Sequence, residues 1–247
     1  MNVFAGLIDL IYPPRCAVCQ TFLWSAALSE GLKDLPFCRA CLDGFVEVRS
    51  PICPACGRPY ASGAQDDRWC EDCLRRRPYY DSARALYLYE GGLMTAIHAF
   101  KYGGKSHLAN PLGTLLASFA RACFIHLEGL LVMPVPLHPK RLRERGFNQS
   151  LLLARRVASP LDADLDFLSL RRVRHTKPQT GLDSDERRKN VRRAFEVIDR
   201  KTVKGRTILL VDDVATTGST LNECARVLKR AGAAEVHALA LARTSLL

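Results

Sequence analysis

The chain has 247 residues, of which 48% are hydrophobic, enough for a core in one large or two modest domains. With this composition, a folded chain is expected rather than a disordered one. Because no uncharged apolar run reaches about 18 residues and residues 1–14 carry no basic leader, we expect a cytoplasmic protein without membrane insertion.

The formal net charge of +11 is concentrated in one stretch of the chain. Residues 138–206 contain 19 Lys and Arg against nine Asp and Glu, an excess of ten, and the remainder is nearly neutral. Such an asymmetry favours polyanionic ligands, either pyrophosphate or a nucleic-acid backbone. For any single arginine of the stretch, a solvated helix face is the simpler interpretation.

The first 73 residues hold four Cys-x-x-Cys pairs. The two-residue gap lets both thiolates bind one ion at about 2.3 Å, and two pairs complete a tetrahedral shell, so the spacing predicts two structural zinc ions. A reducing compartment disfavours disulfides. Pairing of successive pairs and a cross-brace both stay open. The predicted ligands are Cys16, Cys19, Cys38, Cys41, Cys53, Cys56, Cys70 and Cys73.

Aromatic residues are frequent in the same segment, several of them next to arginines. Rings beside zinc knuckles usually form the small hydrophobic core of the ribbon. Stacking on the bases of a single strand is the alternative. The rings are Trp24, Phe37, Phe45, Tyr60, Trp69, Tyr79 and Tyr80.

From Asp81 onward, strand-like and helix-like apolar patterns alternate. Strands are predicted over 83–89, 131–135, 168–172, 194–198, 207–211 and 236–241. Helices are predicted over 93–100, 111–124 and 148–157, after a capping box of Asp183 and Glu186, and along Leu221, Ala225 and Leu228 up to Gly232. A proline-marked loop follows residues 131–135.

This alternation predicts an α/β fold, a mainly parallel sheet with helices on both faces and ligands at the carboxyl ends of the strands. The boundary lies where the cysteines stop, giving a zinc-ribbon domain over 1–80 and a sheet domain over 81–247.

The segment AFKYGGKS, residues 99–106, matches a relaxed nucleotide P-loop pattern. A P-loop has to follow a strand, whereas Leu93, Ile97 and Phe100 recur at helical spacing before it. The glycines are therefore predicted to end a helix, and ATP hydrolysis is disfavoured.

The most informative stretch is VDDVATTGST, residues 211–220, which follows the apolar run 208–210. At the end of a buried strand, Asp212 and Asp213 can accept hydrogen bonds from a diol such as ribose O2 and O3. The alternative is that Asp213 only caps a helix. The turn that follows offers N–H groups and a helix N-terminus to a phosphate through Ala215, Thr216, Thr217, Gly218, Ser219 and Thr220.

Diol and phosphate sites together resemble the phosphoribosyl-pyrophosphate motif of type I phosphoribosyltransferases. With the zinc knuckles and the segments MPVPLHPKRLRERGFNQ (133–149) and TKPQTGLDSDERRKNVRRAF (176–195), nearly the whole chain is similar to the ComF family of competence-associated, phosphoribosyltransferase-like proteins. The resemblance implies a type I phosphoribosyltransferase-like sheet domain after a small double zinc-ribbon domain.

The resemblance also implies ligands and roles. It implies phosphoribosyl pyrophosphate with Mg²⁺ as ligand, Asp212 and Asp213 as catalytic residues, and a mobile flap at residues 172–179, where Lys177 and Gln179 are further candidates. Arg145 has an equally good structural interpretation, holding its loop. Beyond the phosphate loop, the implied substrate-binding residues are Leu137, His138, Lys140, Arg141, Arg145 and Arg174.

Two functional hypotheses follow from the resemblance. The first is a phosphoribosyltransferase that releases pyrophosphate and has a role in DNA uptake during natural transformation. The second is a non-catalytic competence protein that binds single-stranded DNA or docks a competence helicase or other DNA-uptake proteins. No segment of the sequence identifies an acceptor.

Overall fold

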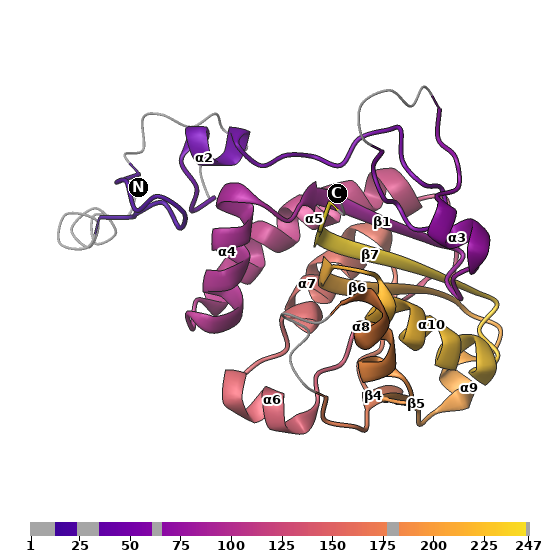
Figure 1. The fold of residues 1–247 in the computed structure, drawn as a ribbon. Helices are drawn as coiled ribbons and strands as arrows, with labels where there is room; N and C mark the ends of the chain where they lie inside the picture. The colour runs from indigo at the N-terminus through magenta and orange to yellow at the C-terminus, as the bar shows by residue number, and fades with distance from the viewer. Residues whose placement is uncertain (1–12, 24–34, 61–65, 177–182, 246–247) are drawn as a thin grey trace.

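The computed structural model describes residues 13–23, 35–60, 66–176 and 183–245 (Figure 1). Its centre is a five-stranded, all-parallel sheet with the strand order β1-β7-β6-β2-β3. Strands β4 and β5 pair with each other as a separate antiparallel hairpin. The strands are β1 (Ser82–Leu88), β2 (Leu131–Pro134), β3 (Asp164–Leu165), β4 (Leu170–Arg172), β5 (Phe195–Val197), β6 (Thr207–Ala215) and β7 (Glu235–Arg243).

Helices cover both faces of the sheet, as the alternating pattern predicts. Helices α4, α5 and α7 pack on one face, and α8, α9 and α10 pack on the other. No helix of the described ranges is long and apolar enough to cross a membrane. The helices are α2 (Arg39–Asp43), α3 (Glu71–Arg75), α4 (Gly91–Tyr102), α5 (Ala109–Phe124), α6 (Pro139–Arg145), α7 (Gln149–Ala158), α8 (Ser184–Val191), α9 (Arg200–Val203) and α10 (Ser219–Ala231), with 3₁₀ turns at Ser106–Leu108 and Ser159–Leu161.

Strand β6 shows why its sequence is a continuous apolar run. Ile208 and Leu210 pack into the core under α10, while Leu209 and Val211 pack into the core under α4, α5 and α7. Successive side chains of a strand point to opposite faces, and a parallel strand covered on both faces has to be apolar at every position. This central strand carries the predicted site at its carboxyl end.

Several predicted boundaries differ from the structure. Strand β6 continues to Ala215, four residues past the predicted end, so the acids lie within the strand. The proline-marked loop is wrong in part, since it contains helix α6, which begins after the cap residue His138 with a proline at its first position and ends at Gly146 with φ of 83°. The capping box before α8 and the stop at Gly232 are confirmed.

The cysteine-rich segment lies along the β1 edge of the sheet. Residues 46–48 run antiparallel to β1, where Val48 donates to the Leu86 carbonyl and Leu88 donates to the Val46 carbonyl. Phe45 makes an edge contact with Tyr87, with ring centroids 5.6 Å apart. The segment therefore covers a strand edge that would otherwise expose unpaired backbone groups.

Candidate active site

The two acids of the predicted motif point to different sides of β6. Asp213 shares the face of Leu209 and Val211, which α4 covers, and Asp212 shares the face of Leu210. Both residues are buried, with exposed fractions of 9% for Asp212 and 3% for Asp213 over the whole residue. Buried carboxylates need partners, so their contacts decide which of them is charged.

Asp212 is held by hydrogen bonds. Its Oδ1 accepts from Ser150 Oγ at 2.9 Å and from the backbone N–H of Asp213 at 2.9 Å. Burial, followed by the charge of Asp213, raises the pKa of Asp212 to about 7. The Asp212 carboxyl group therefore keeps its proton to a much higher pH than an ordinary aspartate.

Asp213 is paired with a lysine that reaches in from the end of α4. Lys101 Nζ lies 2.9 Å from Asp213 Oδ2, and the two side chains are 16% and 4% exposed. Among described residues, this oxygen receives no hydrogen bond of standard geometry, while Oδ1 accepts from the Val214 N–H at 2.7 Å. Burial, the largest single effect, would lower the pKa of Lys101, but its interactions with Asp213 and the charge of Asp212 together outweigh burial and the pKa is raised. Asp213 Oδ2 is thus a buried acceptor whose partner among the described residues is the ammonium group of Lys101.

The turn after β6 has the geometry of a phosphate cradle. Gly218 has φ of 72° and is the cap residue of α10, whose N-terminus opens into the turn. Thr217 Oγ1 and Ser219 Oγ are 2.7 Å apart, so the two hydroxyl groups lie within hydrogen-bond distance of each other. The predicted residues 215–219 line one small hollow of about 110 Å³, and Thr220 lies in the first turn of α10.

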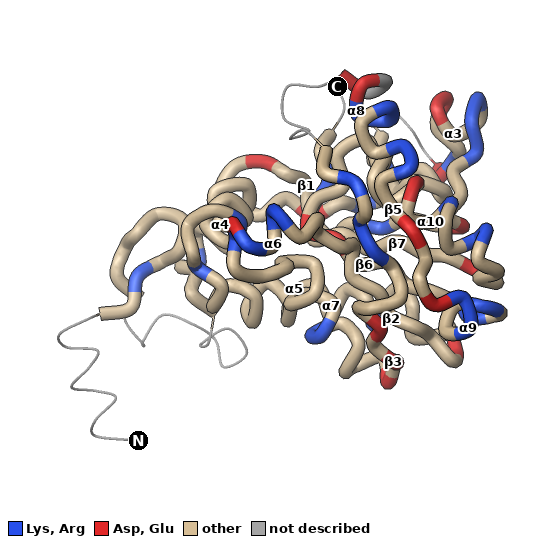
Figure 2. Tube along the Cα trace, turned by 90° about the horizontal axis from the view of Figure 1, so that it is seen from below, with Lys and Arg blue, Asp and Glu red and all other residues tan. Residues whose placement is uncertain are grey.

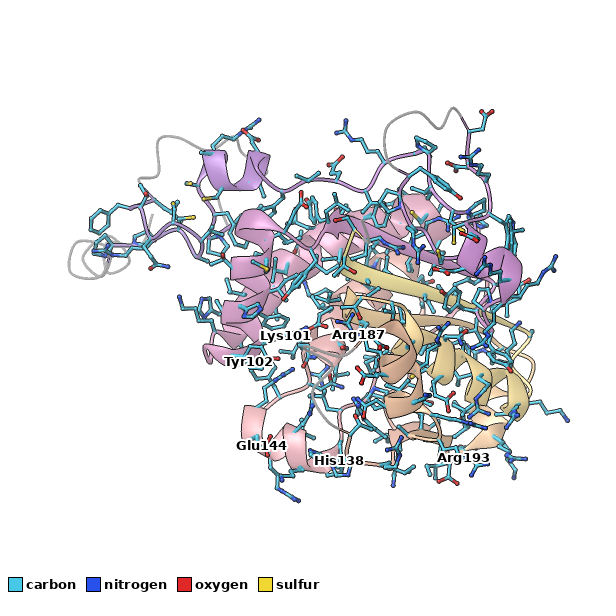
Figure 3. The ribbon with its side chains drawn as sticks, viewed as in Figure 1. Lys101, Tyr102, His138, Glu144, Arg187 and Arg193 are labelled. Atoms are coloured by element: carbon cyan, nitrogen blue, oxygen red, sulfur yellow. The ribbon has the colours of Figure 1, made fainter. Side chains whose placement is uncertain are left out.

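A larger, basic cleft of about 490 Å³ lies between α4 and α6 (Figure 3). Figure 3 shows Lys101 and Tyr102 from α4 on one side, with Glu144 and His138 from the α6 segment on the other. The loop after β2 is joined to β6 where Val135 donates to the Val211 carbonyl at 2.9 Å. The cleft is lined by Lys101, Tyr102, Gly104, Lys140, Arg141, Glu144, Arg145 and His175. Three predicted pyrophosphate residues, Lys140, Arg141 and Arg145, are therefore brought together beside Lys101.

The other predicted residues have different surroundings. Leu137 lines a separate, mostly apolar hollow with Phe147. His138 uses Nδ1 to accept from the Lys140 N–H at 3.2 Å, which caps α6. Arg174 Nη2 donates to the carbonyls of Asn190 and Arg192 at 2.7 and 2.8 Å, at the end of α8. The structure does not place Leu137 and Arg174 together with the cleft residues, whereas the His138 ring contacts that of the cleft residue His175, with centroids 5.1 Å apart.

The predicted flap is anchored at its first end. Arg172 Nη2 donates to Thr176 Oγ1 at 2.5 Å, and Arg141 Nη2 donates to the Thr176 carbonyl at 3.3 Å. The flap candidates Lys177 and Gln179 lie outside the described residues. Thr176 therefore ties the start of this segment to a cleft residue.

The eight predicted cysteine ligands form two groups of four. In each group the ligand sulfur atoms lie within 4.8 Å of one another. Cys19 and Cys38 Sγ are 3.6 Å apart, and Cys56 and Cys70 Sγ are 3.7 Å apart, close to the edge of about 3.8 Å of a tetrahedron with 2.3 Å zinc–sulfur bonds. Each tetrad could hold zinc, and successive pairs combine rather than a cross-brace. The tetrads are Cys16, Cys19, Cys38 and Cys41, and Cys53, Cys56, Cys70 and Cys73.

Burial separates the aromatic rings into two groups. Phe37, Phe45 and Tyr80 are buried and fill the core, as the structural interpretation predicts. Trp69 and Tyr79 are 37% and 48% exposed. Tyr60 is half-buried, Arg77 lies over the Trp69 ring with Cζ 5.1 Å from the centroid, and Trp24 lies outside the described residues.

Comparisons with known proteins agree with this architecture. Residues 148–245 match the phosphoribosyl transferase domain family, and residues 7–74 match the double zinc ribbon domain family. The chain is 34% identical over 234 residues to "Competence protein F" of Haemophilus influenzae, covering 93% of this chain and 96% of that protein. This chain belongs to the ComF family.

Other relatives of this ComF-family chain have similar coverage. "DNA utilization protein YhgH" of Salmonella typhimurium is 33% identical over 225 residues, covering 90% of this chain and 96% of that protein. "Competence protein ComFC" of Bacillus subtilis is 31% identical over 222 residues, covering 85% of each chain. The resemblance stated from the motifs is confirmed, together with the phosphoribosyltransferase-like fold and the zinc-ribbon segment.

Sequence reasoning missed two residues of the site, Lys101 and Ser150. Each lies on a helix remote in sequence from β6 and is brought to the site by the packing of that helix on the sheet. Lys101 stands inside the AFKYGGKS segment whose P-loop interpretation fails, since α4 precedes the glycines. A lysine in the last turn of a helix commonly complements the helix dipole. The sequence therefore gives no reason to assign Lys101 to the site.

Proposed function

We propose that this ComF-family protein binds phosphoribosyl pyrophosphate with Mg²⁺ at the end of β6 and transfers the phosphoribosyl group with release of pyrophosphate. We place this activity in the cytoplasm, with a role in DNA uptake during natural transformation. The observation that carries the proposal is the buried Asp213 Oδ2, which lacks a well-directed donor and stands on the same strand that leads into the phosphate cradle.

The two halves of the motif suit the two ends of a ribose 5-phosphate. The N–H groups at the start of α10, with Thr217 and Ser219, would bind the 5-phosphate. Asp212 and Asp213 would accept from the ribose hydroxyls and offer the hard oxygen ligands that Mg²⁺ prefers. When bound, Mg²⁺ would neutralise charge on the diphosphate oxygens.

The basic cleft suits the leaving group. Lys140, Arg141 and Arg145 line it, and their charges would stabilise the negative charge that pyrophosphate gains. The anomeric C–O bond breaks with its electron pair leaving on pyrophosphate, and the acceptor's nucleophile forms the new bond to the anomeric carbon. Lys101, which borders this cleft and holds Asp213, would pass from the carboxylate to the diphosphate as the ribose arrives.

The test is pyrophosphate release and calorimetric binding with an Asp212→Asn/Asp213→Asn variant. We expect loss of phosphoribosyl pyrophosphate binding by at least about 100-fold, since two charge-assisted contacts are removed. Asp164→Asn, which removes an exposed ion pair with Arg206, is the matched control. Binding and release equal to those of the control would refute the assignment of the acids.

Single-stranded DNA binding is a second candidate, and one observation favours it. The excess of ten positive charges over residues 138–206 places Lys and Arg on α6, α8 and α9 (Figure 2). The names of the relatives refer to competence and DNA utilization. In this proposal the protein binds single strands, or docks a competence helicase or another uptake protein, without turnover.

Salt dependence tests this second candidate. If a strand neutralises the cations, its affinity should fall with salt by a slope of about 0.7 per phosphate contact. Fluorescence anisotropy with a labelled oligonucleotide between low and physiological salt measures that slope. A flat response would exclude backbone recognition, and binding that survives Asp212→Asn/Asp213→Asn would separate it from the sugar site.

A further inference from the structure

The phosphate cradle has a second wall, and that wall comes from the second zinc tetrad. The small hollow in front of residues 215–219 is also bordered by the zinc ligands Cys56 and Cys73. Helix α3, which follows Cys70, lies beside the β1 and β7 side of the sheet (Figure 1). A pocket formed by one loop of the sheet domain is thus closed by residues more than 130 positions away in sequence.

Backbone contacts fix this wall in place. The Ala83 N–H donates to the Ala55 carbonyl at 2.7 Å, and Arg243 Nη1 donates to the Cys56 carbonyl at 2.5 Å. A Cβ on Gly57 would lie 2.4 Å from the Ala83 carbonyl oxygen, so the knuckle touches β1 where only glycine fits. The second ribbon is therefore held against the strands that frame the cradle.

The segment between α3 and β1 adds contacts with the cradle itself. The Tyr79 N–H donates to Asn222 Oδ1 on α10 at 2.7 Å. The Tyr80 hydroxyl lies 3.3 Å from the position that a Cβ on Gly218 would take, and the Tyr80 side chain is buried. A hydroxyl donor from outside the sheet domain thus reaches the glycine of the phosphate loop.

The hollow is strongly basic, since five arginines and one carboxylate, that of Asp72, line it. Arg58 pairs with Asp72 at 2.7 Å, yet its Nε is buried and has no hydrogen-bond partner among described residues. The same holds for Nε of Arg243, whose side chain is 5% exposed. Arg76 and Arg77 also line the hollow, and both residues are exposed. Buried guanidinium donors without partners point to an anion that is part of the functional state.

We infer that the described parts of the second zinc ribbon, residues 53–60 and 66–73, and the segment that follows them form part of the phosphomonoester site. Arg58, Arg76, Arg77 and the Tyr80 hydroxyl bind the phosphate of a sugar 5-phosphate from the side opposite the N-terminus of α10. The identity of the sugar rests on the proposed function, whereas the phosphomonoester is assigned from the hollow alone. Phosphate affinity then depends on the second zinc tetrad and not on the first.

An Arg76→Ala/Arg77→Ala variant tests this site, with Arg75→Ala as its matched control. Arg75 precedes the pair, forms an ion pair with Glu71 at 2.5 Å and does not line the hollow. Calorimetric titration of the zinc-loaded full chain uses ribose 5-phosphate and inorganic phosphate as probes. We expect both to bind at least about tenfold more weakly to the double variant and within about twofold of wild type to Arg75→Ala.

The two probes separate this inference from the proposed function. Asp213→Asn should weaken ribose 5-phosphate and leave inorganic phosphate unchanged, because the acid contacts the sugar. If wild type binds ribose 5-phosphate and the Arg76→Ala/Arg77→Ala variant binds it equally well, the ribbon wall is wrong and the sugar site stands. If wild type binds neither probe, both assignments are overturned.

Discussion

The two ends of the candidate site differ in how they are built. The phosphate end is a hollow of about 110 Å³, bounded by a fixed turn, a helix N-terminus and the second ribbon. The opposite end is a cleft of about 490 Å³, lined by long cations from α4 and α6 and by His175 of the predicted flap. A rigid end suits a group that stays bound throughout, and an open, basic end suits a group that leaves.

The ion pair of Lys101 and Asp213 lies between the two ends of the site. Breaking it should give the largest of the expected effects. Lys101→Met should lower the free energy of unfolding by about 3 kcal/mol, because it leaves Asp213 buried without its counter-charge. Chemical denaturation measures this loss. The double variant Lys101→Met/Asp213→Asn should recover most of it, and equal losses in the single and double variants would show that the loss does not come from the unpaired charge of Asp213.

Removing cations at the open end should weaken the binding only of ligands that carry a diphosphate. Lys140→Ala/Arg141→Ala is expected to weaken phosphoribosyl pyrophosphate by about 100-fold and ribose 5-phosphate by less than about twofold. Arg143→Ala is the control, since Arg143 lies exposed on α6 and does not line the cleft. If both ligands weaken equally, the distinction between the two ends fails.

Asp212 makes the site sensitive to pH. Because the pKa of Asp212 is raised to about 7, the folded protein keeps a proton there between roughly pH 4 and 7 that the unfolded chain has lost. The contribution of Asp212 to stability therefore declines as pH rises through this window and is constant above it. Ligands that need the ionised carboxylate bind more weakly below pH 7.

We expect affinity for phosphoribosyl pyrophosphate with Mg²⁺ to fall about tenfold from pH 8 to pH 6, with proton release on binding. Calorimetry in two buffers of different ionisation enthalpy measures the released protons. In the Asp212→Asn variant only the ligand itself still titrates. The part of the pH dependence and of the proton release that comes from Asp212 should therefore disappear. An unchanged pH profile in this variant would assign the effect to the ligand alone.

The smallest effect concerns the turn at the rigid end. Gly218→Ala places a Cβ at φ of 72° and 3.3 Å from the Tyr80 hydroxyl, and should cost about 1 kcal/mol of stability. Gly146→Ala has a φ of 83° with open space around it, so it reports backbone strain alone. Thermal denaturation compares the two, and only Gly218→Ala should also weaken inorganic phosphate. Equal phosphate affinity in both variants would remove Gly218 from the cradle.

The central motif is predictable because its signals are local. The motif consists of an apolar run, two acids, small hydroxyl residues and Gly218, all next to one another in the chain. Each of these patterns predicts its local structure without help from distant residues. The tetrads are predictable for the same reason, since Cys-x-x-Cys spacing is set by zinc geometry. The way in which the four Cys-x-x-Cys pairs combine into two tetrads is not predictable, because it depends on which pairs the fold brings together.

What the sequence does not reveal arises from contacts across the sheet. Lys101 reaches Asp213 from α4, Ser150 reaches Asp212 from α7, and Arg58 reaches the cradle from the zinc ribbon. No local pattern distinguishes these from surface residues. Helix α6 is a different case, since His138, Pro139 and Gly146 are ordinary helix boundaries that the prolines of the preceding loop concealed.

The most direct test of the account is a crystal structure of the zinc-loaded protein with phosphoribosyl pyrophosphate and Mg²⁺. The account predicts the 5-phosphate on residues 216–219, the ribose hydroxyls at Asp213, and the diphosphate between Lys101 and Arg141. Density for the ligand elsewhere on the protein, with this strand end and its hollow free of ligand, would contradict it.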